Sequence, residues 1–544
     1  MPINLNSIKC IPRLPREWVI VAALALAGLL IRGIFFNYYA FEGSDCDGAS
    51  YIKLADNIST GNGWQSNKLQ MLFLLPDNLP YPESHWSPLF PLILASFFRL
   101  FGSGYAVAKL VPLLFGVLII PATYWLTREL TGSRVAAFIA GILALTHQSL
   151  ISYSLRMLTE SGTIFLVALT FILCISARTR HRPYLAGLAL GLAYLMKYQS
   201  ILLWPAVALL NFLNHPWRAA VRRLVVAAAV FVVTISPWLI RNTMEFGDPF
   251  YTDLKYNVLA FQSEFGGQHR YFGSLEVPPS IGEFFIAHPR SVIRHAMIGA
   301  RTLQREFFKR NVSLPFFLPL ALLGLPTAWR RKRLWLPVLL YAALLIGVVS
   351  ISLPIGRYML SIMPPWMALA GAGGCTLWKF NSTRHPIRIL ARIAVIVLVT
   401  GAATSQVRGA ISEVKCNRAV WHPICNYCAL EAAAVSDYIR IHTNADEPIL
   451  CAEVFHYSLI LNRNCIAVPF DEDALIAVSR RYNARYLVIS ARDLARCLPG
   501  WVENVPPWVH LVHSVPAKRI PRPARNPDYL YVSDLFIYRL EFQY

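Results

Sequence analysis

The sequence is poor in charge, and in negative charge above all. Only 15% of its 544 residues are charged, whereas 56% are hydrophobic. Asp and Glu together number 30, against 51 Lys and Arg. So little charge excludes an ordinary soluble domain, and repeated apolar runs approach the length needed to cross a bilayer. The chain is therefore predicted to be a polytopic α-helical membrane protein.

The shortage of acids is confined to one part of the chain. Residues 1–405 carry 36 Lys and Arg against 16 Asp and Glu, whereas residues 406–544 carry 15 against 14. Much of the basic excess lies in short loops between apolar runs, which is the positive-inside pattern rather than a nucleic-acid-binding face. No nucleic-acid partner is expected. No cleavable signal peptide is expected either, because the first apolar run is long and no small-residue cleavage site follows it.

The apolar runs predict eleven transmembrane helices. They lie at residues 18–36, 106–127, 134–152, 161–177, 184–196, 200–213, 223–240, 314–329, 334–353, 358–377 and 389–405. Every loop that this count places inside is basic, as the positive-inside rule requires. The N-terminus is therefore predicted in the cytoplasm, and the odd number of spans places the C-terminus outside. Residues 88–101 are apolar but short, which predicts an interfacial or re-entrant helix.

Two loops and the tail are predicted on the outer side. The loops are residues 37–105 and 241–313, inside a transmembrane domain of residues 1–405. The tail, residues 406–544, shows helix and strand patterns in alternation. Helices are expected at 429–441 and 471–482, and strands at 448–454, 486–489 and 536–540. This pattern predicts a small extracytoplasmic α/β domain.

Six of the ten cysteines lie in this tail. An oxidising compartment would permit disulfides there. Alternatively, Cys425 and Cys428 with Cys416 and His422 could hold zinc, although no second spaced pair accompanies them. Disulfides, zinc and free thiols all stay open at this point.

The acidic segment at residues 44–64 carries the first candidate site. Apolar residues at helical spacing begin at Tyr51, and Gly61 and Gly63 end the pattern. Asp45 and Asp47 are thus expected just before a helix N-terminus. Either one caps the helix by accepting backbone N–H groups, or one is a catalytic base presented at the level of the lipid headgroups. The residues alone leave both interpretations open.

Other ionisable residues are expected near the outer ends of the spans. They are His85, Glu160, Lys197, Arg241 and Arg357. Ionisable groups at membrane depth are costly and usually face a polar cavity. Lys197 and Arg357 could instead extend to lipid phosphates, and Glu160 could simply begin a helix. Arg241 ends its span with an outward cation, against the positive-inside bias, which favours a functional role.

Several segments resemble the GT-C glycosyltransferases of the family 39 type, which include protein O-mannosyltransferases and the lipid A aminoarabinose transferase. The matching segments are 47–51 (DGASY), 54–58 (LADNI), 61–64 (GNGW), 87–92 (SPLFPL), 101–102 (FG), 158–160 (LTE), 237–242 (PWLIRN), 246–249 (FGDP) and 357–358 (RY). Their order and membrane placement make the resemblance fairly specific over residues 18–370. Residues 84–87 (SHWS) and Asp47-Gly48 depart from the two best-known subgroups, so neither of their substrates is carried over.

The resemblance implies transfer of a sugar from a polyprenyl-phosphate donor to a lipid, glycan or protein acceptor. It places the site on the extracytoplasmic side of the cytoplasmic membrane. Asp47 is the expected base, with Asp45 second. The expected donor-phosphate ligands are Arg241 first, then Lys197, His85 and Arg357, with Glu160 and Tyr358 as further candidates. No metal or cofactor is implied, although the Asp45-Cys46-Asp47 D-x-D could hold a divalent cation through its carboxylates.

Two other classes of function remain. A transporter or flippase of lipid-linked sugars would be expected to show internal repeats and charges near mid-membrane, and neither is evident in the sequence. A non-catalytic assembly subunit with a receptor-like outer domain is the third alternative. A folded but inactive Asp47→Asn protein would favour the enzyme over both.

Overall fold

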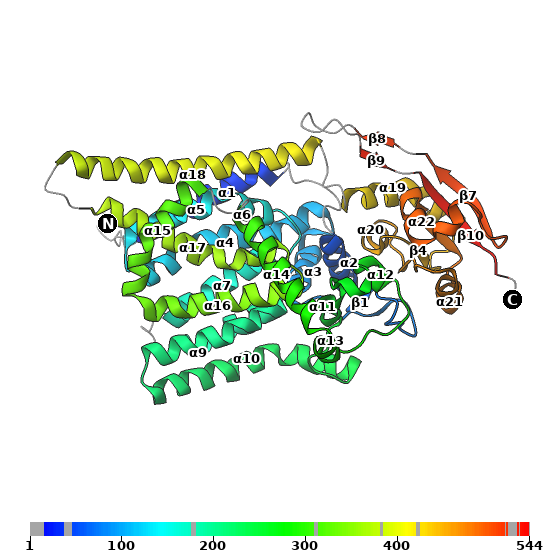
Figure 1. Ribbon diagram of the computed structural model, residues 1–544, viewed down its shortest axis with the longest axis horizontal. Helices are drawn as coiled ribbons and strands as arrows, with labels where there is room; N and C mark the ends of the chain where they lie inside the picture. The colour runs from blue at the N-terminus through cyan, green and yellow to red at the C-terminus, as the bar shows by residue number, and fades with distance from the viewer. Residues whose placement is uncertain are drawn as a thin grey trace, which may run out of the picture.

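The computed structural model describes residues 16–36, 46–175, 181–308, 314–380, 385–419, 425–516, 518–520, 530–532 and 534–542. Long helices form a bundle that fills one end of the molecule, and a β-sheet with its own helices forms the other (Figure 1). Short helices from the two predicted outer loops lie between them. The candidate site residues discussed below gather where the bundle meets these loops.

Each of the eleven predicted spans falls mainly on helix, but His147 has an extended backbone and divides the span predicted at residues 134–152 into two shorter helices. The bundle helices are α1 (Arg16–Phe36), α4 (Tyr105–Thr131), α5 (Arg134–Thr146), α6 (Gln148–Tyr153), α7 (Glu160–Ile175), α8 (Arg182–Met196), α9 (Leu203–Asn214), α10 (Trp217–Phe246), α15 (Leu314–Arg330), α16 (Lys332–Ile351), α17 (Met363–Trp378) and α18 (His385–Ala419). By length and composition, α1, α4, α10, α16 and α18 can each cross a membrane. The chain is thus an integral membrane protein, and the number of crossings stays a prediction.

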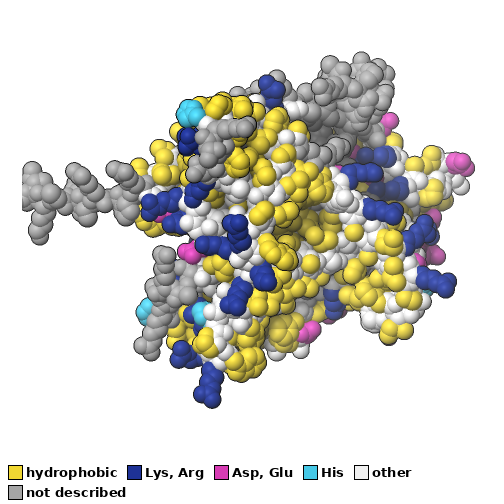
Figure 2. Space-filling view, turned by 60° about the vertical axis from the view of Figure 1, so that its left-hand side comes forward, with side chains coloured by type: hydrophobic (Ala, Val, Ile, Leu, Met, Phe, Trp, Pro, Cys, Tyr) yellow, Lys and Arg dark blue, Asp and Glu magenta, His cyan; other side chains and the backbone are white. Residues whose placement is uncertain are grey.

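The loops predicted to be cytoplasmic meet at one end of the bundle. Arg331, between α15 and α16, donates from Nη1 to the carbonyl of Glu129 near the end of α4 at 3.3 Å. Asn214, at the end of α9, donates to the carbonyl of Arg333 at 3.4 Å. Lys and Arg side chains are spread over this end when it is brought forward (Figure 2). The predicted topology requires such a basic end, and its cytoplasmic orientation stays a prediction.

The bundle packs closely where glycines meet backbone. A Cβ on Gly373 of α17 would lie 1.8 Å from the carbonyl oxygen of Leu320 on α15, and one on Gly324 of α15 would lie 2.0 Å from that of Leu369. Small residues let transmembrane helices approach in this way, because packing rather than the hydrophobic effect holds them together in lipid. The α15–α17 contact therefore depends on these two glycines.

The described sheet of the tail has six strands in the order β2 (Lys68–Leu69), β5 (Cys465–Ala467), β4 (Ile449–Cys451), β6 (Tyr486–Ser490), β10 (Leu535–Leu540) and β7 (Val509–Val515). The first four run parallel, whereas β10 is antiparallel to both of its neighbours. Leu487 and Ile489 of β6 pack in the cluster that includes α21 (Glu472–Tyr482). Val488 packs on the other side, with α19 (Cys425–His442) and α20 (Val454–Ile460). Both faces are buried, as is usual for parallel strands.

The helices and strands predicted for the tail are present at the expected positions. The sequence did not predict that Lys68–Leu69, from the first loop, would join the sheet as an edge strand beside β5. Two residues offer too little pattern to be recognised as a strand. This pairing couples the acidic loop to the tail.

The structure describes the side chains of only some of the cysteines on which the predicted disulfides or zinc site of the tail depend. The side chains of Cys416, His422, Cys425 and Cys428 lie outside the described residues, so their disulfides or zinc stay predictions. Cys465 and Cys497 are buried thiols that contribute to the two faces of the sheet.

We expect Gly373→Ala to destabilise the bundle, by roughly 1–3 kcal/mol, because its new methyl group would collide with backbone that cannot rotate away. The midpoint of thermal unfolding in detergent measures this effect. Gly347→Ala on α16 is the matched control, since nothing lies within 4 Å of its Cβ position. Equal midpoints for the two variants would contradict the role given to the close approach.

Candidate active site

The acidic segment forms α2 (Cys46–Thr60), which begins earlier than predicted. Tyr51 faces inward, with its ring 4.6 Å from that of Trp86. At the other end, Gly61 adopts a φ of +89°, which glycine accepts without strain, and the helix stops. Asp47 therefore lies in the first turn of α2, where the helix dipole favours a negative charge, and not before the helix as predicted. Asp45 lies outside the described residues, and its roles stay predictions.

Three other residues predicted for the site lie at helix ends, and their charged groups gather beside Asp47. Glu160 is the first residue of α7, and Lys197 is the C-cap of α8. Both positions favour the charge that each side chain carries. Arg357 belongs to the 3-10 helix η6 (Gly356–Ile362), which turns the chain between α16 and α17. Ends of helices thus provide the whole charged cluster.

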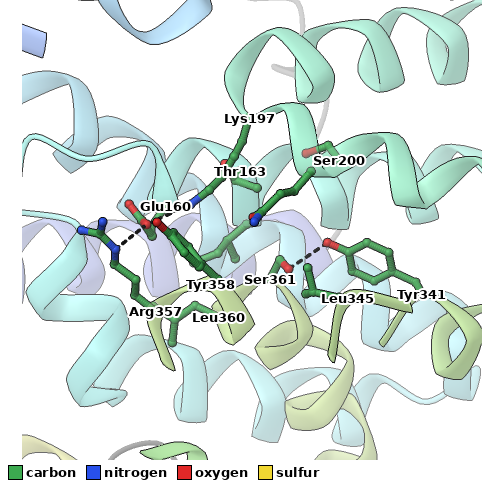
Figure 3. Close-up of a pocket in the computed structure, with 12 residues that line it drawn as sticks. Glu160, Thr163, Lys197, Ser200, Tyr341, Leu345, Arg357, Tyr358, Leu360 and Ser361 are labelled. Atoms are coloured by element: carbon green, nitrogen blue, oxygen red, sulfur yellow. Dashed lines mark hydrogen bonds and ion pairs between the residues drawn. The ribbon is translucent and has the colours of Figure 1, made fainter. Parts of the chain in front are cut away.

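The four side chains form a continuous line of alternating charge. The Lys197 ammonium donates to Glu160 Oε1 at 3.0 Å, and Arg357 Nε lies 3.5 Å from the same oxygen. Figure 3 shows Lys197 and Arg357 approaching Glu160 from two sides. The other end of the guanidinium donates from Nη2 to Asp47 Oδ2. Tyr358 completes the group, because the Lys197 ammonium lies 4.0 Å from its ring centroid.

The two carboxylates differ in accessibility. The Glu160 side chain is 4% exposed, whereas that of Asp47 is 28% exposed. Burial opposes the ionisation of Asp47, but the Arg357 guanidinium, and then His85 and Lys197, hold the pKa of this carboxyl below its ordinary value. Asp47 is therefore an ionised carboxylate that a reacting group can reach.

A small cavity of about 10 Å³ lies behind the cluster. This is room for about one water molecule. Its lining includes Glu160, Ser200 and Arg357. Within the described part of the chain, Glu160 Oε2 and Ser200 Oγ are buried without a hydrogen-bond partner. Sequence reasoning missed Ser200, because a lone serine carries no signal.

His85 lines a separate and larger cavity of about 380 Å³ among the outer loops. Its Nδ1 lies 2.6 Å from Asp253 Oδ1, and both side chains are nearly buried. Lys68 and Glu83 form a buried ion pair beside it, at 3.7 Å. Asp253 escaped the sequence analysis because it lies 168 residues from His85 and matches no motif.

Arg241 is not part of the line of charge. Its guanidinium lies 4.9 Å from the ring centroid of Trp238 and 5.0 Å from that of Phe246, and it donates to Asn242 Oδ1 at 3.1 Å. The geometry thus brings Asp47, Glu160, Lys197, Arg357 and Tyr358 together, with His85 close enough to affect the Asp47 carboxylate. It does not bring Arg241 to them.

Comparison with known proteins tests the expected family. Residues 84–240 match the family described as dolichyl-phosphate-mannose-protein mannosyltransferase. No curated protein matches the sequence significantly. A solved structure of ArnT from Cupriavidus metallidurans bound to undecaprenyl phosphate is 14% identical, with a TM-score of 0.58, over 96% of this chain and 98% of that one. The chain has the GT-C fold.

A second GT-C structure supports this assignment. The archaeal oligosaccharyltransferase AglB from Archaeoglobus fulgidus, in complex with an inhibitory peptide and a dolichol-phosphate, is 13% identical with a TM-score of 0.59. The alignment covers 87% of this chain and 69% of AglB. The GT-C resemblance found in the sequence is therefore confirmed. The family match contains His85, Glu160 and Lys197 but ends before Arg357 and begins after Asp47, so roles at the GT-C site must be argued from its geometry.

The Asp253 carboxyl gives a prediction for pH. Burial opposes its ionisation, but His85 and Lys68 hold its pKa below the ordinary value of 3.8. A depressed carboxyl pKa contributes stability above the unfolded pKa, and that contribution is lost as pH falls through the folded value. We expect Asp253→Asn to lower the midpoint of thermal unfolding at neutral pH, with the difference from wild type shrinking below about pH 4.

Asp248→Asn is the matched control, since Asp248 bonds only locally to the backbone N–H of Phe250 among its described contacts. A pH-independent difference for Asp253→Asn would show that the ionisation of the buried Asp253 carboxyl does not cause it.

Proposed function

We propose that the chain transfers a sugar from a polyprenyl-phosphate donor to an acceptor hydroxyl or amine at the membrane surface. The observation that carries the proposal is the contact of Arg357 with Asp47, where a reachable carboxylate and a cation share one site at the membrane end of the outer loops. The dolichol-phosphate and undecaprenyl phosphate in the AglB and ArnT structures support a lipid-phosphate ligand for this fold.

The reaction needs one group to take a proton and others to accept negative charge. The acceptor oxygen or nitrogen attacks the anomeric carbon, the bond from that carbon to the phosphate oxygen breaks, and the phosphate leaves with the electron pair. Asp47 takes the acceptor's proton. Arg357 and Lys197 face the charge that grows on the phosphate, and they stabilise the transition state more than the ground state.

Arg357 couples the proton transfer to Asp47 to the binding of the donor. While its guanidinium binds Asp47, the carboxylate is ionised but weakly basic. A donor phosphate competes for the same guanidinium, whose fork suits phosphate geometry. Donor binding then releases Asp47 from its ion pair and raises its basicity. Acceptor activation would thus follow donor binding.

Glu160 has a positioning role in this scheme. It is too buried to meet a substrate directly, at 4% exposure, yet it contacts both cations. Two adjacent cations would otherwise repel each other, so the carboxylate lets both face one phosphate. We assign the larger cavity beside His85 to the acceptor, because outer-loop residues line most of it whereas the donor lipid arrives from the bilayer. Its volume suits a small-molecule group.

We also place the site on the extracytoplasmic side of the cytoplasmic membrane. The basic end of the bundle is the support for this orientation, because the site lies among the loops at the opposite end. The Arg357 guanidinium already binds the Asp47 carboxylate and neutralises its charge, so we propose that no metal is needed there.

The base assignment is tested by Asp47→Asn. We expect turnover to fall roughly 10²-fold or more, the usual scale for losing a general base. Purified protein is incubated with a panel of polyprenyl-phosphate sugars, and release of polyprenyl phosphate is followed. Asp56→Asn, on the same helix, is the folding control and should keep wild-type turnover.

Near wild-type turnover of a folded Asp47→Asn protein would rule Asp47 out as the base. An equal loss in Asp45→Asn would point to a metal held by both carboxylates.

The phosphate role is tested by Arg357→Ala and Arg357→Lys. We expect Arg357→Ala to weaken donor use at least tenfold, and Arg357→Lys to restore only part of it because the bidentate fork is lost. Arg241→Ala is the comparison, with a smaller effect expected because Arg241 lies outside the charged line. A larger effect at Arg241 than at Arg357 would restore the sequence-based order of the two residues.

A further inference from the structure

The residue before Asp47 in the chain, Cys46, lies against the tail. Helix α2 packs on α20, and Lys53 of α2 donates to Asn462 Oδ1, just after α20, at 2.5 Å. Cys46 occupies the first position of α2, at the same interface. The start of the helix that carries Asp47 is therefore in contact with a part of the chain about 400 residues later.

Three potential metal ligands converge at this interface. The Cys46 thiol, a Glu453 carboxylate oxygen and a His456 ring nitrogen all lie within 4.8 Å of one another. His456 is fully buried, and its Nδ1 lies 3.0 Å from Glu453 Oε2. Cys46 and Glu453 are half-buried. The group thus combines sulfur, nitrogen and oxygen ligands in a site that is mostly closed to solvent.

This ligand set selects among metals. Magnesium and calcium prefer oxygen ligands, whereas thiolate and imidazole favour zinc or a similar borderline ion. Zinc binds at about 2.0–2.3 Å from its ligands, so ligand atoms around it lie roughly 3–4 Å apart. The three atoms need only a small closing movement to reach that spacing. A fourth position stays available for water.

We infer that Cys46, Glu453 and His456 bind a zinc ion that fastens the tail to the first turn of α2. The ion would bridge α20 and the residue next to the proposed base, and so fix the backbone from which Asp47 projects. This site differs from the D-x-D site that Asp45 and Asp47 would form, because it uses the central cysteine of that motif and two residues of the tail.

Helix capping accounts for only part of the arrangement. Glu453 is the N-cap of α20 and accepts from the backbone N–H groups of Phe455 and His456 at 3.2 and 2.9 Å. A capping carboxylate needs neither a thiol nor an imidazole beside it. The convergence of Cys46 and His456 on the same carboxylate is what points to an ion.

The metal content of the full-length protein, purified in detergent without added chelator, tests the site. We expect about one zinc per chain by elemental analysis, lost in Cys46→Ser and in His456→Gln. Glu453→Gln should retain less zinc than wild type, although its amide oxygen can still cap α20. Cys375→Ser is the matched control, because Cys375 lies on α17 beside Ser133 and should not affect zinc.

Cobalt gives a readout that does not depend on activity, and its first arm uses the wild-type protein alone. Wild-type protein stripped of metal and titrated with Co²⁺ should develop a thiolate-to-cobalt charge-transfer band, and Cys46→Ser should not. A wild-type protein that binds neither zinc nor cobalt, or a cobalt spectrum without the thiolate band, would overturn the inference. So would zinc that stays unchanged in both Cys46→Ser and His456→Gln. None of these measurements depends on sugar transfer. The zinc site can therefore be disproved without affecting the proposed function, and the reverse also holds.

Discussion

The site depends on one guanidinium shared between two carboxylates. Arg357 contacts the buried Glu160 through Nε and the accessible Asp47 through Nη2. An unpaired charge at this depth would be costly, so each member of the line requires its neighbour to be ionised. Because the members come from α2, α7, α8 and η6, the ion pairs also fix these helix ends relative to one another. The same contacts therefore organise the fold locally and hold the charged side chains of the candidate site together.

The outer part of the molecule is built to hold the first loop in place. Its helix α2 contacts η6, at the end of the bundle, through Asp47 and the tail through Lys53, and its strand β2 joins the tail's sheet. A segment with so few residues could not by itself hold a carboxylate at a defined position. Contact with two larger units replaces the rigidity that the loop lacks.

The sequence was a good guide wherever a pattern repeats. Apolar runs located the bundle helices except for the break between α5 and α6, and strand and helix periodicity located the elements around β4, α21 and β6. Charged residues at expected helix ends identified Glu160, Lys197 and Arg357, because an ionisable group in an apolar setting is a strong signal. Glu160 and Arg357 also lie in segments that resemble the GT-C family, whereas Lys197 does not.

Contacts between distant residues could not be predicted in the same way. Nothing local to Asp253 shows that it faces His85, and nothing local to Arg241 shows that its guanidinium rests on Trp238 and Phe246. The two-residue strand β2 has no periodicity at all. Such features follow from tertiary packing, which a single sequence does not reveal.

The edge strand β2 has a consequence for the order of assembly. Asn67, just before it, bonds to Asn464 across a separation of 397 residues, so this partner is synthesised only after every described helix of the bundle. During synthesis the contact between the first loop and the tail's sheet cannot form until the bundle segments have been made. Such long-range pairing is slow to form. The pairing that joins the loop carrying Asp47 to the tail is therefore completed late, after the residues of every described bundle helix exist.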